Sequence, residues 1–220
     1  MKAYIFDLDG TLFESMDVWA KIDGAFFQKR GLTPPKGYAE ATMAMHIDEA
    51  AAYTIKLMNL DENIENIKEE WLRIAKNAYE NDVKMKPYAK EYLAKLSAKG
   101  YKLAIATSLP EELMVPALHK HGIYHIFHAI CNAREVGTGK SKPDIFILAA
   151  KKLGVLPGDC LLFDDILPAV KSAKSIGMKV CAVYDKSSRR DWDEIQTIAD
   201  FAITDFKQAW ELILFPSNPE

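Results

Sequence analysis

The chain has 220 residues, of which 49% are hydrophobic and 27% are charged, and its formal net charge is -3 at pH 7. This composition is typical of a globular protein with a buried core and excludes a disordered or fibrous chain. Because the net charge is slightly negative and no basic stripe is interleaved with aromatic residues, we expect no nucleic-acid partner. No apolar stretch reaches the length of a transmembrane helix, so no membrane partner is expected either.

The cysteines and the N-terminus bear on the compartment. Cys131, Cys160 and Cys181 are an odd set without the Cys-x-x-Cys spacing of redox and zinc motifs. Two of them lie beside strand-like runs, which favours buried free thiols. The N-terminus has one lysine and then only a short apolar run, which does not resemble a signal peptide. We therefore expect a cytoplasmic protein, and we expect it to be a monomer.

The first apolar run, residues 3–6, leads into the string Asp7-Leu-Asp9-Gly-Thr11. The run is short and rich in β-forming residues, so it predicts a buried strand that ends in a tight turn. Two carboxylates that are two positions apart at a strand end can point the same way. Such a pair can hold a divalent metal, and one acid can attack an electrophile while the other transfers a proton.

Residues 15–82 have the pattern of consecutive helices. Gly31 and Pro34-Pro35 end the first helix, and Asp61 is the expected N-cap of the third. Apolar residues recur at helical spacing in three stripes: Val18, Ile22 and Phe26; Ile47, Ala51, Ile55 and Met58; and Ile64, Ile67, Trp71, Ile74 and Ala78. We therefore predict an all-helical insertion over residues 15–82, between two parts of a core that comprise residues 1–14 and 83–220.

From Tyr88 onward, helices and strands alternate. The predicted helices span residues 88–99, 110–122, 143–153 and 168–176, and the predicted strands span residues 101–107, 127–131, 160–163, 179–184 and 201–204. Strands separated by helices of this length imply right-handed crossovers and a mainly parallel sheet with helices on both faces. The predicted class is therefore α/β, with a Rossmann-like sheet. A sheet of this kind binds its ligand beyond the carboxyl ends of its strands.

Four polar segments fall at that edge of the predicted sheet. They contain Asp7 and Asp9, Thr107 and Ser108, Lys140 in the loop 137–142, and Asp164 and Asp165. Taken singly, each has an ordinary structural explanation, such as a helix cap or a solvated lysine. Together they bring metal-binding acids, a hydroxyl group, a lysine and a reactive acid to one place, which favours phosphoryl transfer.

The same segments resemble the motifs of the haloacid dehalogenase superfamily of phosphohydrolases. In chain order they read Asp7-Leu-Asp9-Gly-Thr11, Ala106-Thr107-Ser108, Gly139-Lys140-Ser-Lys-Pro143-Asp144 and Phe163-Asp164-Asp165. The helical insertion resembles the small cap of the phosphatase and β-phosphoglucomutase branch. One departure is Asp164, where many relatives have glutamate. Lys140 is the lysine that fits the family's Lys-x-x-Pro-Asp spacing. Lys142, two residues further on, is expected to point outward.

This resemblance implies roles in catalysis and substrate binding. Asp7 would be the nucleophile and would form a transient aspartyl phosphate. Asp9 would protonate the leaving oxygen and then activate the water that hydrolyses the intermediate. Thr107, Ser108 and Lys140 would bind the phosphoryl group. The substrate would be a small phosphorylated metabolite, such as a sugar phosphate or phosphoglycolate, beneath the helical cap.

The resemblance also implies a Mg²⁺ cofactor. Its ligands would be Asp7, the main-chain carbonyl of Asp9, and Asp165. Because the Asp164 side chain is shorter than glutamate, it would either contact the ion or lie directly behind it.

Three functions are compatible with these motifs, and a phosphatase is favoured. The second acid, Asp9, argues against the dehalogenase and phosphonate-cleaving branches, which generally lack it. A sugar phosphomutase of the β-phosphoglucomutase type is the alternative, but that branch has a cap histidine where this chain has Trp19. A non-catalytic binding module is disfavoured because every acid of the core motifs is present.

Overall fold

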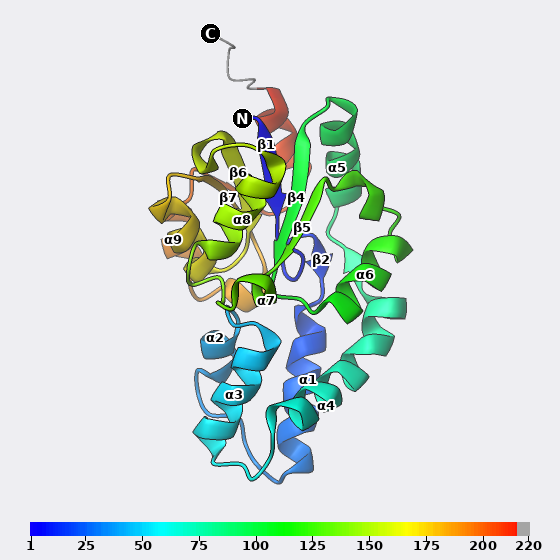
Figure 1. Cartoon of the computed structure of the whole chain (residues 1–220), viewed down its shortest axis with the longest axis vertical. Helices are drawn as coiled ribbons and strands as arrows, with labels where there is room; N and C mark the ends of the chain where they lie inside the picture. Colours follow the sequence, from blue (N-terminus) through cyan, green and yellow to red (C-terminus); the bar gives the residue numbers. More distant parts are fainter. Residues whose placement is uncertain (215–220) are drawn as a thin grey trace.

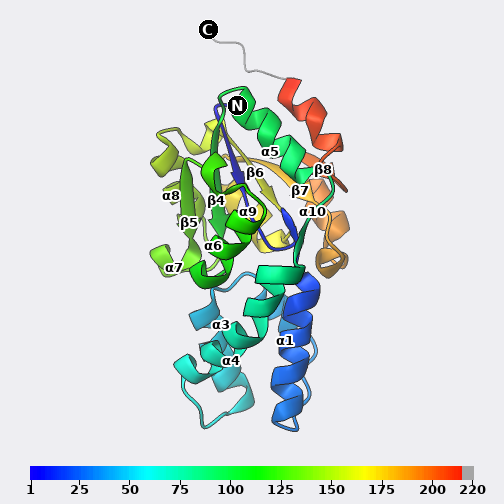
Figure 2. The same cartoon turned by 90° about the vertical axis from the view of Figure 1, so that its right-hand side faces the viewer.

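The computed structural model describes residues 1–214. It consists of two parts stacked along the long axis of the molecule (Figure 1). One part is a sheet with helices on both faces, and the other is a group of helices at the end away from the N-terminus (Figures 1 and 2).

The main sheet has six strands in the order β5-β4-β1-β6-β7-β8, and every neighbouring pair is parallel. The strands are β1 (Ala3–Phe6), β4 (Lys102–Thr107), β5 (Ala129–Asn132), β6 (Cys160–Asp164), β7 (Lys179–Val183) and β8 (Phe201–Ile203). Strand β1 lies near the middle and all of its residues are buried, as expected for a strand that is covered on both faces. The predicted Rossmann-like α/β class is confirmed.

Helices cover both faces of this sheet. They are α5 (Ala89–Ala98), α6 (Glu111–Lys120), α7 (Ala133–Val136), α8 (Asp144–Leu153), α9 (Leu167–Ser175) and α10 (Trp192–Ile198), with short helical turns at Tyr124–Ile126, Pro157–Asp159, Lys186–Ser188 and Gln208–Leu214. Successive residues of β1 enter opposite cores: Tyr4 and Phe6 join the one with α5 and α6, while Ala3 and Ile5 join the one with α8 and α9. Because successive side chains of a strand point to opposite faces, β1 contributes to the core on each face of the sheet.

The second part consists of α1 (Met16–Lys29), α2 (Tyr38–Thr42), α3 (Ile47–Met58) and α4 (Ile64–Asn77), which continues in the π-helical turn η1 (Ala78–Asp82). Phe26 of α1 packs edge-on against Trp71 of α4, with ring centroids 5.5 Å apart. The expected N-cap of α4, Asp61, was wrong. The side chain of Asn63 accepts a hydrogen bond of 2.9 Å from the main-chain N–H of Asn66, because Asn63 directly precedes the first helical residue.

The chain enters and leaves this helical part through two short strands that pair with each other. Strands β2 (Phe13–Glu14) and β3 (Lys84–Met85) are antiparallel. Beyond β3, Lys86 forms a 2.8 Å ion pair with Asp185, which follows β7. Both side chains are largely buried, so this pair fixes the return of the chain to the sheet.

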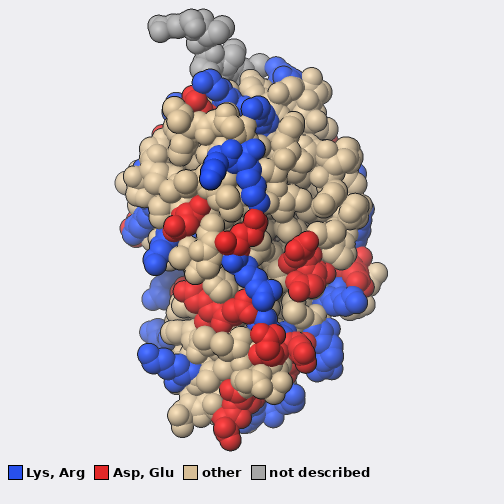
Figure 3. All heavy atoms as spheres, viewed as in Figure 1, with Lys and Arg blue, Asp and Glu red and all other residues tan. Residues whose placement is uncertain are grey.

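The face of the molecule in Figure 3 carries charges of both signs. Acidic and basic side chains are interspersed on the face in Figure 3, over both parts of the molecule. In the described part of the chain, none of the helices has the length and hydropathy that a membrane-crossing segment needs.

Candidate active site

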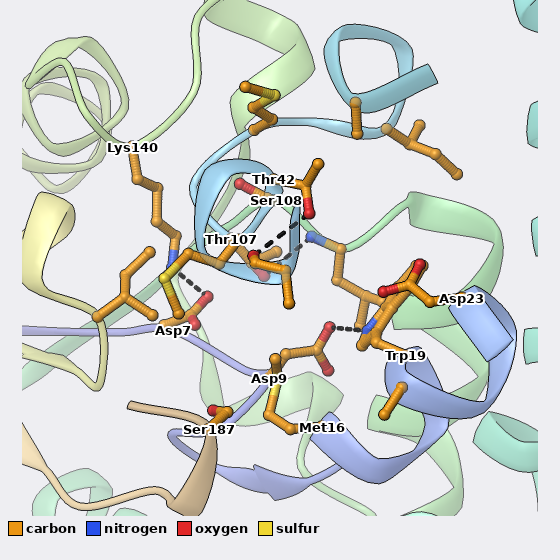
Figure 4. Close-up of a pocket in the computed structure, with 18 of the residues that line it drawn as sticks. Asp7, Asp9, Met16, Trp19, Asp23, Thr42, Thr107, Ser108, Lys140 and Ser187 are labelled. Carbon is orange, nitrogen blue, oxygen red and sulfur yellow. Dashed lines mark hydrogen bonds and ion pairs between the residues drawn. The ribbon is translucent and has the colours of Figure 1, made fainter. Parts of the chain in front are cut away.

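The polar segments at the carboxyl ends of the strands face the helical part across a cavity of about 220 Å³ (Figure 4). Its walls include six of the residues singled out in the sequence: Asp7, Asp9, Thr107, Ser108, Lys140 and Asp165. The opposite wall is largely apolar and includes Met16, Trp19, Tyr38, Met43 and Trp71 from the helical part. The structure therefore brings residues from four separate segments to one site.

Asp7, at the end of β1, lies next to a buried lysine. The Lys140 ammonium is 2.6 Å from Asp7 Oδ1 and 2.9 Å from Asp164 Oδ2. Burial would lower the pKa of Lys140, but the charges of Asp164 and Asp7 outweigh it and raise this pKa. The other oxygen of Asp164 accepts the main-chain N–H of Ile166 at 3.2 Å. Both carboxylate oxygens of Asp164 are thus bonded to protein donors, and Lys140 stays charged.

Asp165 is fully buried in the turn after β6. It accepts hydrogen bonds from the hydroxyl groups of Thr11, at 2.9 Å, and Ser188, at 3.3 Å. Burial raises its pKa well above the usual range, and the neighbouring Asp164 charge adds to this. Gly10 has a φ of +76°, and a Cβ there would clash with the Asp165 carboxylate. Glycine is therefore required at this position for two reasons, its backbone conformation and the close approach of the carboxylate.

The acidic cluster suits a divalent cation. Asp7, Asp164 and Asp165 are buried, and each offers a carboxylate oxygen within 4.8 Å of the others. Of the residues that the structure describes, these form the one such group of three. Buried carboxylates need compensating charge, and hard oxygen donors are the ligands that Mg²⁺ prefers. The donor set therefore fits the Mg²⁺ that the resemblance implies.

Asp9 points away from this cluster, toward the helical part. Its Oδ1 accepts hydrogen bonds from Ser15 and Tyr79, both at 2.6 Å, and its Oδ2 accepts one from the Trp19 indole at 3.0 Å. Burial raises the pKa of Asp9 to about 6, although these donors oppose the shift. A carboxyl group with this pKa can exchange a proton near neutral pH, as a general acid and base must.

The hydroxyl groups after β4 face the cavity from the side of the sheet. Thr107 is 1% exposed, and its Oγ1 accepts the main-chain N–H of Leu109 at 3.2 Å. Ser108 Oγ is buried and, within residues 1–214, has no hydrogen-bond partner. Both hydroxyl groups can still donate to a ligand oxygen.

The loop that presents Lys140 also contacts the helical part. The main-chain N–H of Lys140 donates to the carbonyl of Ala44 at 2.8 Å, and its carbonyl accepts from Ser172 Oγ at 2.8 Å. A Cβ on Gly139 would clash with the Ala44 oxygen, so only glycine allows this approach. Lys142 is exposed, as expected from its register.

Sequence reasoning missed the donors that hold Asp9. Ser15 and Trp19 are four positions apart in the sequence, and this spacing would have placed them on one face of the first helix. Tyr79 is 70 positions from Asp9, and no local pattern indicates it. It reaches the site only because η1 returns the chain beside the start of α1.

Comparison with known proteins agrees with this interpretation of the motifs. The profile of the haloacid dehalogenase-like hydrolases matches residues 4–183. A phosphorylated carbohydrates phosphatase of Thermotoga maritima is 25% identical over 81% of this chain and 83% of its own length. A probable pseudouridine-5'-phosphatase of Drosophila melanogaster is 27% identical over 92% of this chain and 90% of its own. The expectation of a hydrolase that acts on phosphoric monoesters is confirmed by these relatives.

Solved structures show the same fold. CbbY from Rhodobacter sphaeroides, in complex with phosphate, superposes with a TM-score of 0.82 at 22% identity, over 94% of this chain and 95% of that one. β-Phosphoglucomutase from Clostridium difficile superposes with a TM-score of 0.78 at 21% identity, over 97% of this chain and 96% of that one. The motifs, the fold and the family profile lead to one conclusion: the chain belongs to the haloacid dehalogenase-like hydrolases.

Proposed function

We propose that this protein is a Mg²⁺-dependent phosphatase that hydrolyses small phosphomonoesters through an aspartyl-phosphate intermediate. The observation that supports this most is the arrangement around Asp7. Its carboxylate is buried at the cavity, paired with Lys140 at 2.6 Å, and close to Asp165. Asp9 lines the same cavity two residues further along the chain.

The reaction follows from the chemistry of these side chains. Asp7 attacks phosphorus, the bond from phosphorus to the leaving oxygen breaks, and Asp9 gives that oxygen a proton. Asp9 then takes a proton from a water molecule, which attacks the phosphorus and releases Asp7 and inorganic phosphate. Lys140 neutralises charge on Asp7 and the phosphoryl group, and Thr107 and Ser108 donate to the phosphoryl oxygens.

Asp7, Asp165 and the main-chain carbonyl of Asp9 would hold the Mg²⁺. When bound there, the ion supplies positive charge that offsets the repulsion between the nucleophile and the phosphoryl oxygens. Asp164 would lie behind it, because its oxygens are bonded to Lys140 and Ile166. In that position Asp164 holds the lysine in place.

We also propose that residues 15–82 act as a cap over a core formed by residues 1–14 and 83–220. The cap residues supply the apolar wall of the cavity and three donors to Asp9. Closing this wall excludes bulk water from the reacting groups. The names of relatives, which include a phosphatase of phosphorylated carbohydrates, support a small phosphorylated metabolite as the substrate. A cytoplasmic location and a monomeric state remain predictions.

A phosphomutase is the second candidate, because β-phosphoglucomutase shares the fold. A mutase must bind the second phosphate group of its bisphosphate intermediate and protect its phosphoenzyme from hydrolysis while that intermediate reorients. Among the described residues that line the cavity, the only cation is Lys140, which is already paired with Asp7 and Asp164. In place of a cap histidine, Trp19 donates to Asp9. These observations favour the hydrolase.

The test is phosphate release from a panel of phosphomonoesters with Mg²⁺ present. The Asp7→Asn variant should lose turnover and keep its fold, because the amide has the same shape but is not a nucleophile. The exposed Asp17 provides the matched control, and Asp17→Asn should leave turnover unchanged. Substantial hydrolysis by Asp7→Asn would exclude this nucleophile. Efficient formation of glucose 6-phosphate from β-glucose 1-phosphate with a trace of the 1,6-bisphosphate would favour the mutase.

A further inference from the structure

A carboxylate on the cap wall of the cavity has no part in the chemistry described above. Asp23 lies one helical turn after Trp19 on α1, and both residues line the cavity (Figure 4). Asp23 is partly buried, and among the described residues no group forms a hydrogen bond or an ion pair with it. Because Asp23 lines the cavity without a partner in the part of the chain that the structure describes, its carboxylate is free to accept a hydrogen bond from a ligand there.

The neighbourhood of Asp23 offers no compensating charge. Tyr38, which lines the same wall, has its hydroxyl group hydrogen-bonded to Thr54 at 2.8 Å. Burial raises the pKa of Tyr38 to about 12, and the nearby Asp23 charge adds to this. The one cation of the described lining, Lys140, is held by two other carboxylates. A second anionic group on a substrate would therefore be repelled by the Asp23 carboxylate, because no unpaired cation in the described lining would neutralise it.

A second unpaired group in this wall indicates what the ligand offers. Trp71 lines the cavity and is 4% exposed, and its indole nitrogen has no hydrogen-bond partner in the described part of the chain. Buried indole N–H groups usually have a partner. A hydroxyl group can accept from an indole N–H and donate to a carboxylate, whereas an ammonium group only donates and a carboxylate only accepts.

We propose that Asp23 is a specificity-determining residue, which together with Trp71 binds a hydroxyl group of the leaving group and rejects leaving groups with a second negative charge. This inference rests on the proposed function, because it assumes that the phosphoryl group binds at Asp7 and Lys140. It selects as the substrate class phosphomonoesters whose leaving group is an uncharged polyhydroxy compound. It excludes bisphosphates and phosphorylated carboxylic acids.

A binding experiment tests the inference without depending on turnover. The ligands are glucitol 6-phosphate and 6-phosphogluconate, which differ only in a terminal hydroxymethyl or carboxylate group. Calorimetric titration into the Asp7→Asn protein with Mg²⁺ should show a preference for glucitol 6-phosphate of at least about tenfold, because like charges at a binding site are disfavoured. Adding Asp23→Asn should reduce this preference to within about threefold. Adding Asp17→Asn, on the same helix but outside the cavity, should leave it unchanged.

Trp71→Phe tests the second group. It keeps an aromatic ring beside Phe26 and removes only the N–H donor, so affinity for glucitol 6-phosphate should fall about three- to tenfold. Unchanged affinity would remove Trp71 from the site.

The outcomes separate this inference from the proposed function. If the preference for glucitol 6-phosphate over 6-phosphogluconate is the same with and without Asp23→Asn, the role of Asp23 is overturned. This conclusion does not depend on whether the unmodified protein releases phosphate. The expected preferences together with no phosphate release by the unmodified protein would overturn the phosphatase assignment and leave the role of Asp23 standing. Failure of both ligands to bind would overturn the inferred substrate class, while the phosphatase assignment would still depend on phosphate release from the panel.

Discussion

Replacing Asp23 by asparagine should stabilise the protein at neutral pH. Burial raises the pKa of Asp23 from 3.8 to about 6, because the folded protein disfavours the charged form. At about 1.36 kcal/mol for each pKa unit, this shift corresponds to at most about 3 kcal/mol of lost stability above pH 6. Because the side chain is partly exposed and the new amide also lacks partners, the gain from Asp23→Asn should be about 1–2 kcal/mol.

The pH dependence makes this prediction specific. Between pH 3.8 and about 6 the unfolded chain loses the Asp23 proton before the folded protein does, so the charge progressively destabilises the fold as the pH rises. Urea unfolding of the variant and the parent should therefore differ most at pH 7 and converge as the pH falls toward 4. A rise in melting temperature of about 2–8 °C at pH 7 is expected for a chain of this size. A variant no more stable than the parent at pH 7, or with an equal gain at pH 4.5, would refute the reasoning. Asp17→Asn should show no such gain.

Four further perturbations have defined outcomes. Asp9→Asn should retain phosphate binding but lower kcat by about 10²–10⁴-fold, measured by phosphate release; a near-normal rate would contradict general acid–base catalysis by Asp9. Gly139→Ala should raise KM and lower the unfolding free energy, because its Cβ would clash with the main-chain carbonyl of Ala44 and force the cap to shift; an unaltered KM would contradict this. Lys86→Met should destabilise the protein by about 3 kcal/mol at pH 7 in urea unfolding, because the largely buried Asp185 would lose its cationic partner. That loss should shrink as the pH falls through the lowered pKa of Asp185, and a pH-independent loss would indicate a packing effect instead. Chelation with EDTA should stop phosphate release and Mg²⁺ should restore it, while full activity in EDTA would exclude the metal.

The strands of the sheet were predictable because each is an apolar run between helices. β1 and β6 are buried on both faces, and such strands read as continuous hydrophobic segments. The pairing of β2 with β3 was not predictable, since each contains only two residues and they are far apart in the sequence. Helix α10 was also missed, because its seven residues bury only Ile195 and leave little periodicity to detect.

The acids of the candidate site could be named from the sequence, but their environments could not. Each acid lies at or just after the end of a strand, and parallel strands bring their carboxyl ends to one edge. Which group each acid bonds depends on side chains from distant elements, as the contact of Tyr79 with Asp9 shows. The isolation of Asp23 was equally hidden, because its spacing in the helix says nothing about partners across the cavity.

The pairing of β2 with β3 makes the helical segment an exchangeable unit. The chain enters the helical segment after Glu14 and leaves it before Lys84, and these two residues are direct partners in the antiparallel pair. A segment whose two ends lie side by side can be lengthened, shortened or replaced while the path of the core chain stays the same. Grafting residues 15–82 from a relative onto this core would therefore transfer one wall of the cavity, with its own recognition groups, and leave the nucleophile, the lysine and the acidic cluster in place. New leaving-group preferences can arise in this way while the nucleophile and its charged neighbours stay unchanged, although the donors to Asp9 would be exchanged with the segment.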